Sequence, residues 1–343
     1  MEKIFIICER DVGLFSLVQQ VVSNVPRALA LGYVPIVYFG RNCCYWHPDG
    51  YRGRDNVWEY YFEPVIPDYD SSAIPRHARD RLETVLFPPE EVESVGLQLD
   101  PSVYLSNHFG DHPSLWGLSL RIPCGSFDPR PSLRRRAARV IRAFVRPRAY
   151  LRAKAEEFGR RYLDGRPVIG VHIRGTDVVA RFRGGVVELD RFGAGISKEL
   201  RRRPDAAILV ATDDAASLAW ARSEFGDRVL GYATVMHTEG TAAGSGPTGA
   251  HMPGYIAEDP AVAALNGEEA VVEYLLLRRC DALIHNGASL ARTVLLAEPD
   301  KTHRNIRAGQ ARNLLDLVRK RDLIGKYHEW FVHGPVDLDR LGI

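Results

Sequence analysis

The sequence predicts an α/β protein built from two successive sets of strand–helix units with parallel sheets. Short apolar runs of strand length alternate with amphipathic helical stretches along the 343 residues. The chain opens on a strand–helix–strand pattern, which requires parallel strands. A break in the pattern near residue 150 separates the two sets, and the length suits one large domain or two of roughly 150 residues each.

The first set begins with a buried strand over residues 3–8 and a loop over residues 9–13. Apolar positions at helical spacing then run from Phe15 towards Leu31 despite Pro26, with Gly32 as a C-terminal cap. Residues 34–38 predict a second strand. Residues 40–75 are rich in aromatic residues, glycine and proline and are too long for a simple connection, which predicts a functional segment or a lid.

The second set begins after a turn signal at residues 164–167. Strands are expected over residues 168–173, 206–211, 228–230 and 280–284. Helices are expected over residues 151–163, 190–203, 215–225, 268–279 and 289–296. Residues 240–254 contain five glycines and two prolines and predict a mobile loop.

Composition excludes several classes of protein. The chain is 45% hydrophobic and 26% charged, as in soluble globular enzymes. Its 45 Lys and Arg nearly cancel 43 Asp and Glu, which disfavours a nucleic-acid binder. No apolar run reaches the roughly 18 residues of a membrane helix, and residues 3–8 are too short for a signal peptide. Five scattered cysteines without a CxxC pair predict free thiols and a cytoplasmic location, with Cys43 and Cys44 as ordinary thiols or a reactive vicinal pair.

Residues 130–152 carry nine arginines, with apolar residues between them at helical spacing. The pattern predicts either a solvated helix face or a patch that contacts an anionic substrate or a membrane surface.

Polar clusters follow three strands of the second set, at residues 172–177, 212–214 and 285–289. Because ligands bind beyond the carboxyl ends of parallel strands, we expect these clusters to converge. Arg174, beside Gly175, can bind a diphosphate through its planar guanidinium. The alternative is a salt bridge to Asp177 or Asp213.

Other candidates surround Arg174. Ser289 begins a helix, where it either contacts a phosphate or caps the helix. Asp213 and Asp214 hold the Arg174 region, contact the nucleotide or cap the following helix. Glu273 lies on an otherwise apolar helix and needs a partner, for which the amide and amino edge of a purine is suited.

Other site types lack their signatures. No His or Cys ligand spacing appears, and the acidic triplets at residues 68–70 and 337–339 lie in irregular segments, so no metal is expected. The Walker A, GxGxxG and GxSxG patterns are absent, which argues against P-loop NTPases, NAD enzymes and serine hydrolases.

Three motifs resemble those of the GDP-fucose-dependent fucosyltransferases, which include the core α1,6-fucosyltransferases, the rhizobial nodulation fucosyltransferase and the protein O-fucosyltransferases. Residues 171–177 resemble their H-x-R-x-x-D motif and residues 210–214 their second motif. Glu273, Asp281 and Ser289 resemble the third, with its two spacings of eight residues. The resemblance covers residues 165–297. It implies a GT-B fold, with two Rossmann-like domains whose parallel sheets face each other across a cleft.

The resemblance also implies which residues form each domain and which contact the donor. Residues 1–150 would form the acceptor-side domain and residues 151–343 the nucleotide-sugar domain. The last helix of the chain would pack back on the acceptor-side domain. The implied contacts are Arg174 to the β-phosphate, Ser289 to a phosphate, Glu273 to the guanine edge and His172 to guanine. Asp177, Asp213 and Asp214 would be acids around Arg174, with Arg174 and Asp177 as catalytic residues.

Three positions depart from the α1,6-fucosyltransferases, which suggests a more distant branch. Gly175 replaces their second Arg, Val178 their Lys, and Phe182 their proposed catalytic Glu. The base therefore stays open among Glu9, Asp11 and Asp177. Aromatic residues at 45–47 and 57–62 either stack on an acceptor sugar or form a small core under a loop.

The expected activity is inverting, metal-independent transfer of fucose from GDP-fucose to a hydroxyl of a glycan or glycoconjugate. No cofactor besides the donor substrate and no nucleic-acid partner is expected. The alternatives are a transferase of this fold that uses another nucleotide sugar, a non-catalytic protein that binds nucleotide sugars or glycans, and a nucleic-acid binder that uses the arginine run.

Overall fold

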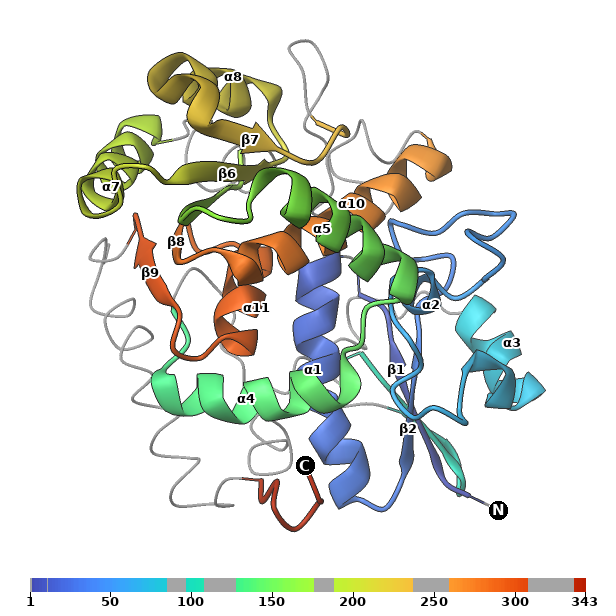
Figure 1. Cartoon of the computed structure of the whole chain (residues 1–343). Coiled ribbons are helices and arrows are strands. Elements are labelled where there is room, and N and C mark those ends of the chain that lie inside the picture. Colours follow the sequence, from blue (N-terminus) through green and yellow to red (C-terminus); the bar gives the residue numbers. More distant parts are fainter. Residues whose placement is uncertain are drawn as a thin grey trace.

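Two sheets flanked by helices organise the computed structural model, which describes residues 2–10, 12–84, 97–107, 128–175, 188–236, 259–307 and 336–343 (Figure 1). The strand orders are β2-β1-β4-β3 and β7-β6-β5-β8-β9. The α/β class and the two sets of strands expected from the sequence are confirmed.

The first sheet contains β1 (Ile4–Cys8), β2 (Val34–Tyr38), β3 (Leu97–Asp100) and β4 (Val103–Ser106). β1 pairs in parallel with β2 and β4, but β3 is antiparallel to β4, so a purely parallel sheet was the wrong expectation at this edge. The reason is that a connection as short as the one from β3 to β4 allows only a hairpin.

Helix α1 (Leu14–Ala30) packs its apolar side into the core beside β1. It continues through Pro26, as the periodicity predicts. Gly32 follows the helix end with φ +74°, a left-handed conformation that glycine adopts without steric cost.

The second sheet is parallel throughout, with β5 (Val168–Ile173), β6 (Ala207–Thr212), β7 (Val229–Gly231), β8 (Ala282–His285) and β9 (Thr302–Asn305). Helices α7 (Leu189–Arg202) and α8 (Ala215–Phe225) pack on one face. Helices α5 (Ala149–Tyr162), α10 (Pro260–Arg279) and α11 (Ser289–Ala297) contribute to the core on the other. The order along the sheet reverses between β5 and β8, and such a reversal is where open parallel sheets bind ligands.

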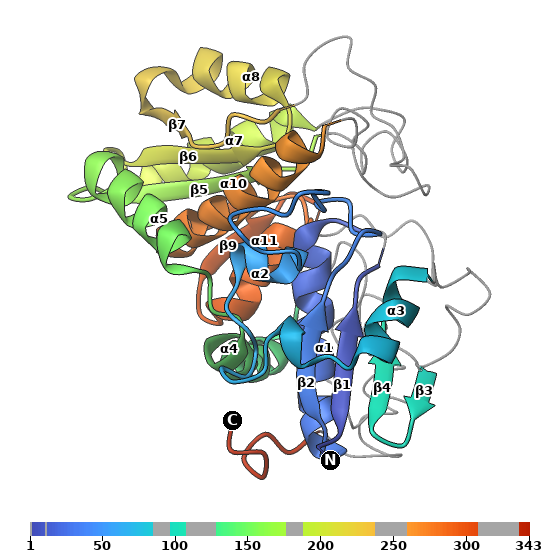
Figure 2. The same cartoon turned by 90° about the vertical axis from the view of Figure 1, so that its right-hand side faces the viewer.

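The two sheets share one apolar core, to which α1, α10 and α11 all contribute. Figures 1 and 2 both show α1 lying between the first sheet and α11. Helix α2 (Val57–Tyr61) packs against α10, and the Tyr61 hydroxyl donates to the carbonyl of Ala264 at 2.8 Å. Helix α3 (Arg76–Thr84) contributes Ala78 and Leu82 to a second apolar cluster with β1, β2 and β4. The division at residue 150 stays a prediction.

The arginine-rich segment forms helix α4 (Pro131–Phe144), a break at residues 145–148 and the start of α5. Helix α4 packs against α11 and α1. Three of its arginines donate within the protein: Arg134 to the carbonyl of Pro129 at 2.7 Å, Arg136 to that of Val336 at 2.7 Å, and Arg139 to Asp339 at 2.5 Å. These internal bonds account for their positions, and membrane contact by this segment has no support in the structure.

No helix in the described ranges is long and apolar enough to cross a membrane. The glycine-rich stretch 240–254 lies outside those ranges, so its expected mobility stays a prediction.

Candidate active site

Arg174 and Asp213 form an ion pair at the carboxyl ends of adjacent strands. Arg174 follows β5 and Asp213 follows β6, so parallel pairing brings them side by side. The Arg174 Nη1 atom lies 2.9 Å from Asp213 Oδ2, and the backbone N–H of Gly175 donates to Asp213 Oδ1 at 2.8 Å. The salt-bridge role of Arg174 is therefore real. A guanidinium has five N–H groups, so an ion pair and a phosphate contact are compatible.

Asn286 fixes the backbone of Arg174 from the neighbouring strand. It follows β8, and its amide Nδ2 donates to the carbonyl of Arg174 at 3.0 Å, while Oδ1 accepts from the backbone N–H of Arg174 at 3.4 Å. This clamp joins β5 to β8 where the strand order reverses. The sequence places Asn286 in a polar cluster but assigns it no role, because a side-chain bond to a backbone 112 residues away has no local signature.

Gly175 is required by close packing against Asp214. A Cβ atom at position 175 would lie 2.7 Å from the Cβ of Asp214, closer than real contacts allow. Any larger side chain at position 175 would meet the same clash. Asp214 caps α8, where its Oδ2 accepts from the backbone N–H of Ser217 at 3.0 Å, so the capping alternative holds for this residue.

Two buried polar atoms near Asp213 have no hydrogen-bond partner among the described residues. They are His172 Nδ1 and Glu273 Oε1. Burial lowers the pKa of His172 to about 4 against the opposing charge of Asp213, so its imidazole is neutral near pH 7. Burial, with help from Glu269 and Asp213, raises the pKa of Glu273 well above its ordinary value. Because an unpaired buried polar atom is costly, both atoms favour a polar ligand.

Ser289 is the first residue of α11, while Ala288 occupies the N-cap and makes no side-chain capping bond. A simple N-cap role for Ser289 is therefore wrong. The Ser289 Oγ lies 2.7 Å from the Oγ of Ser16 on α1. The first-turn N–H groups of such a helix are suited to binding an anion. Asp281, the middle residue of the third motif, instead accepts from the backbone N–H of Val168 at the opposite ends of the strands.

Of the three candidate bases, the structure describes one. Asp177 and Asp11 lie outside the described residues, as do Val178 and Phe182, so the roles expected of them stay predictions. Glu9 follows β1 at the carboxyl end of the first sheet. Burial raises the pKa of Glu9, although bonds from its own backbone and from those of Gly40 and Asn42 oppose this.

The aromatic residues at 57–62 belong to the protein core. Trp58, Tyr60, Tyr61 and Phe62 are at most 1% exposed, which supports the core alternative over sugar stacking. Trp46 and His47 are partly exposed, whereas Tyr45 is buried. Burial raises the pKa of Tyr45, and the hydrogen bond that its hydroxyl accepts from the backbone N–H of Leu14 at 3.1 Å opposes the shift.

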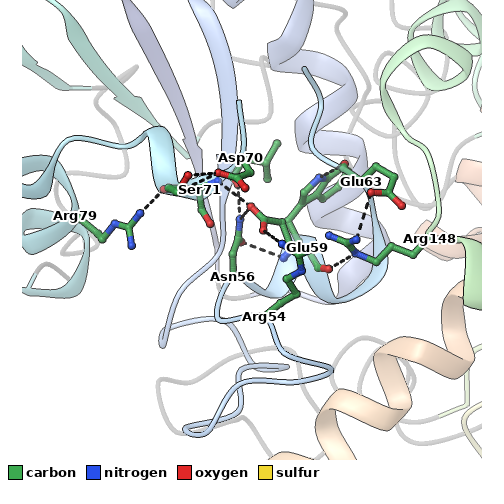
Figure 3. Close-up of polar contacts among 11 residues, drawn as sticks. Arg54, Asn56, Glu59, Glu63, Asp70, Ser71, Arg79 and Arg148 are labelled. Atoms are coloured by element: carbon green, nitrogen blue, oxygen red, sulfur yellow. Dashed lines mark hydrogen bonds and ion pairs between the residues drawn. The ribbon is translucent and has the colours of Figure 1, made fainter. Parts of the chain in front are cut away.

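A polar network holds this aromatic segment in place (Figure 3). Buried Glu59 on α2 accepts from the backbone N–H of Ser71 at 2.9 Å and from Asn56 Nδ2 at 3.0 Å. Arg148 donates to Glu63 Oε2 at 3.3 Å. The partners lie within residues 40–75 and at the break between α4 and α5, so the network fixes a long segment rather than forming a reaction centre.

One group of side chains in the described ranges has metal-ligand spacing. Its possible ligand atoms, from Asp128, His285 and His303, lie within 4.8 Å of one another. However, His285 Nδ1 accepts from the N–H of Gly287 at 3.1 Å, and His303 Nε2 lies 2.6 Å from Arg134 Nη2, which can only donate. The two ring nitrogens that face Asp128, His285 Nε2 and His303 Nδ1, lie 3.3 Å apart, at hydrogen-bond distance from each other, and 3.6 and 3.9 Å from the Asp128 oxygens. Contacts within the protein therefore occupy the ring nitrogens of this group.

Two sheets flanked by helices, with polar side chains gathered at the β5–β8 reversal, fit the GT-B class of fold, as expected. Among solved structures, the chain is similar to the fucosyltransferase NodZ from Bradyrhizobium (TM-score 0.54, 15% identity, 87% of this chain and 92% of that chain). It is also similar to the α-1,6-fucosyltransferase NodZ soaked with GDP-fucose (TM-score 0.51, 15% identity, 87% and 93%). POFUT1 in complex with GDP gives a TM-score of 0.47 at 11% identity over 89% of this chain and 97% of that chain.

No protein-family model and no curated protein sequence matches the chain. The likeness to NodZ establishes the fold.

Proposed function

We propose that the protein is an inverting glycosyltransferase that moves fucose from GDP-fucose to a hydroxyl of a glycan or glycoconjugate. The observation that carries the proposal is the Arg174–Asp213 pair at the strand-order reversal, flanked by His172 Nδ1 and Glu273 Oε1, two buried atoms to which no described residue bonds. A cation is suited to the diphosphate of a GDP-sugar, and a buried carboxylate can accept from the N–H groups of its guanine edge. NodZ, whose fold the chain shares, has been crystallised with GDP and with GDP-fucose.

In the proposed reaction, the acceptor hydroxyl oxygen bonds to C1 of the sugar while the bond from C1 to the diphosphate oxygen breaks. The acceptor proton passes to a base, and GDP leaves with the bonding electrons. Arg174 stabilises the negative charge that grows on the diphosphate, and Asp213 holds the guanidinium for that task. Glu273 accepts from the guanine N–H groups, and neutral His172 offers an acceptor or donor nitrogen.

The remaining parts of the proposal rest on the residue types present. Arg174 can supply the charge that a divalent cation supplies elsewhere, so the transfer is proposed to need neither metal nor cofactor. The described cysteines carry free thiols, in keeping with a reducing cytoplasm. Asp177, Asp11 and Glu9 remain the candidates for the base.

A thermal-shift and transfer experiment tests the proposal. GDP and GDP-fucose should raise the melting temperature, whereas UDP and NAD should not. Equal shifts with UDP would overturn the guanine assignment and leave the fold unaffected. Binding of GDP-fucose without hydrolysis or transfer to any glycan in a panel would favour a non-catalytic nucleotide-sugar-binding protein. Transfer from another nucleotide sugar, but not from GDP-fucose, would identify a transferase with a different donor.

A further inference from the structure

Ser16 and Ser289 join the two halves of the molecule through their hydroxyl groups. Ser16 lies in the first turn of α1, beside the first sheet, and Ser289 begins α11 beside the second. Their Oγ atoms are 2.7 Å apart, at hydrogen-bond distance. This contact connects the first half of the chain to a residue expected to bind the donor phosphate.

A second side chain of α1 fixes the backbone beside this contact. Buried Gln19 donates from Nε2 to the carbonyl of Ser289 at 2.8 Å and to Thr293 Oγ1 at 3.1 Å. Thr293 Oγ1 in turn donates to the same Ser289 carbonyl at 2.8 Å. The position of Ser289 is thus set by three side-chain contacts, two of them from α1.

The number of hydroxyl protons determines which serine of the pair donates when Ser289 binds a phosphate. Each serine hydroxyl has one proton and two acceptor sites. Ser289 can donate to a phosphate oxygen only if it accepts from Ser16, because its single proton cannot serve both. Hydroxyls that donate in series polarise one another, which strengthens the last bond of the series.

We propose that Ser16 is a positioning residue of the donor phosphate subsite, where its hydroxyl orients that of Ser289 towards the phosphate. The inference rests on the proposed function, since it assumes that Ser289 binds a phosphate of GDP. It adds that donor affinity depends on a side chain of the first half of the chain. Such a residue cannot be found from the motifs, all of which lie in the second half.

A double-mutant cycle on GDP binding tests the inference. GDP affinity is measured by calorimetry for the wild type, Ser16→Ala, Ser289→Ala and the double variant, together with melting temperatures. We expect each single variant to bind GDP about 3- to 10-fold more weakly, the size of a lost neutral hydrogen bond. The double variant should be little weaker than Ser289→Ala alone. Ser223→Ala, at an exposed site on α8, is the control and should bind like the wild type.

A comparison of guanosine binding with GDP binding shows whether Ser16 acts on the phosphate subsite or on the structure as a whole, because guanosine has the base and ribose but no phosphate. Ser16→Ala should leave guanosine binding unchanged while GDP binding weakens. Additive losses in the cycle, unchanged GDP binding in Ser16→Ala, or equal losses for guanosine and GDP would each overturn the inference and leave the proposed function standing. Absence of GDP binding in the wild-type protein would overturn both.

Discussion

Asp213 holds Arg174 at two points, through an ion pair to the guanidinium at 2.9 Å and a hydrogen bond from the next backbone N–H at 2.8 Å. The carboxylate therefore determines both the direction of the side chain and the turn that follows β5. Pre-organisation of this kind lets a charge stabilise a transition state without reorganising at the moment of reaction.

Replacement of Arg174 is expected to abolish most turnover. Arg174→Lys keeps a positive charge but cannot span two phosphate oxygens with a planar fork, so it should fail almost as badly as Arg174→Ala. We expect single-turnover rates to fall roughly 10²- to 10³-fold in both variants. Arg201→Ala, at an exposed position on α7, serves as the control. A purely structural Arg174 would instead give a lower melting temperature with near-normal turnover in the folded fraction.

Gly175→Ala should damage the same site by steric conflict. The added Cβ would lie 2.7 Å from the Asp214 Cβ, so the β5 turn or the α8 N-terminus must move. We expect a loss of 1–3 kcal/mol in unfolding free energy, about the cost of overpacking, and weaker GDP binding in urea and calorimetric titrations. Gly193→Ala on α7 is the matched control, because its Cβ meets Trp220 at an ordinary 3.4 Å and alanine favours the helix. Equal stability and affinity in Gly175→Ala and the wild type would contradict the packing argument.

Glu273→Gln should weaken GDP binding and stabilise the ligand-free protein. Burial raises the pKa of Glu273, so its contribution to stability is present at low pH and is lost as the pH rises from its ordinary value of 4.5 through the raised one. Gln carries no charge, so the ligand-free variant should melt higher than the wild type at neutral pH. Its amide NH₂ would face guanine N–H groups, so GDP affinity should fall roughly 10-fold or more.

The pH dependence of GDP binding checks the same carboxylate. Guanine N–H groups need the ionised form, so wild-type affinity should fall as the pH drops through the raised pKa of Glu273. Glu273→Gln should lack this component, and exposed Glu157→Gln on α5 should keep it. Preference for GDP over IDP, which lacks the 2-amino group, should also shrink in Glu273→Gln. An unchanged GDP-to-IDP ratio would show that Glu273 does not read the guanine edge.

Chelation should leave the transfer reaction intact. Arg174 would supply positive charge at the proposed diphosphate site, and contacts within the protein occupy the ring nitrogens of the Asp128, His285 and His303 cluster. Initial rates are measured after dialysis against EDTA and after addition of Mn²⁺ or Mg²⁺. Loss of activity with EDTA that either ion restores would require a metal at the donor site.

Much of the fold could be predicted because its signals are local. The bounds of β2, β5 and α8 match the predicted residues, since each is a short apolar or helical run between turn signals. Strands β3, β4 and β9 and helix α3 were missed. β3 and β9 lie at sheet edges, where all of their residues except Asn305 are at least partly exposed, and their apolar pattern is correspondingly weak. Neither helix α2 nor the polar network around Glu59 could be predicted from a stretch that reads as irregular.

The sequence by itself determined the α/β class, the strand that carries Arg174 and the three clusters that end parallel strands, because periodicity and strand order are properties of neighbouring residues. Tertiary structure decided which partners those residues have. The pairing of Arg174 with Asp213, the Asn286 clamp, the clash that excludes a side chain at Gly175 and the Ser16–Ser289 contact all join segments far apart in the chain. Such contacts depend on how sheets and helices pack in three dimensions, and no local pattern of residues encodes them.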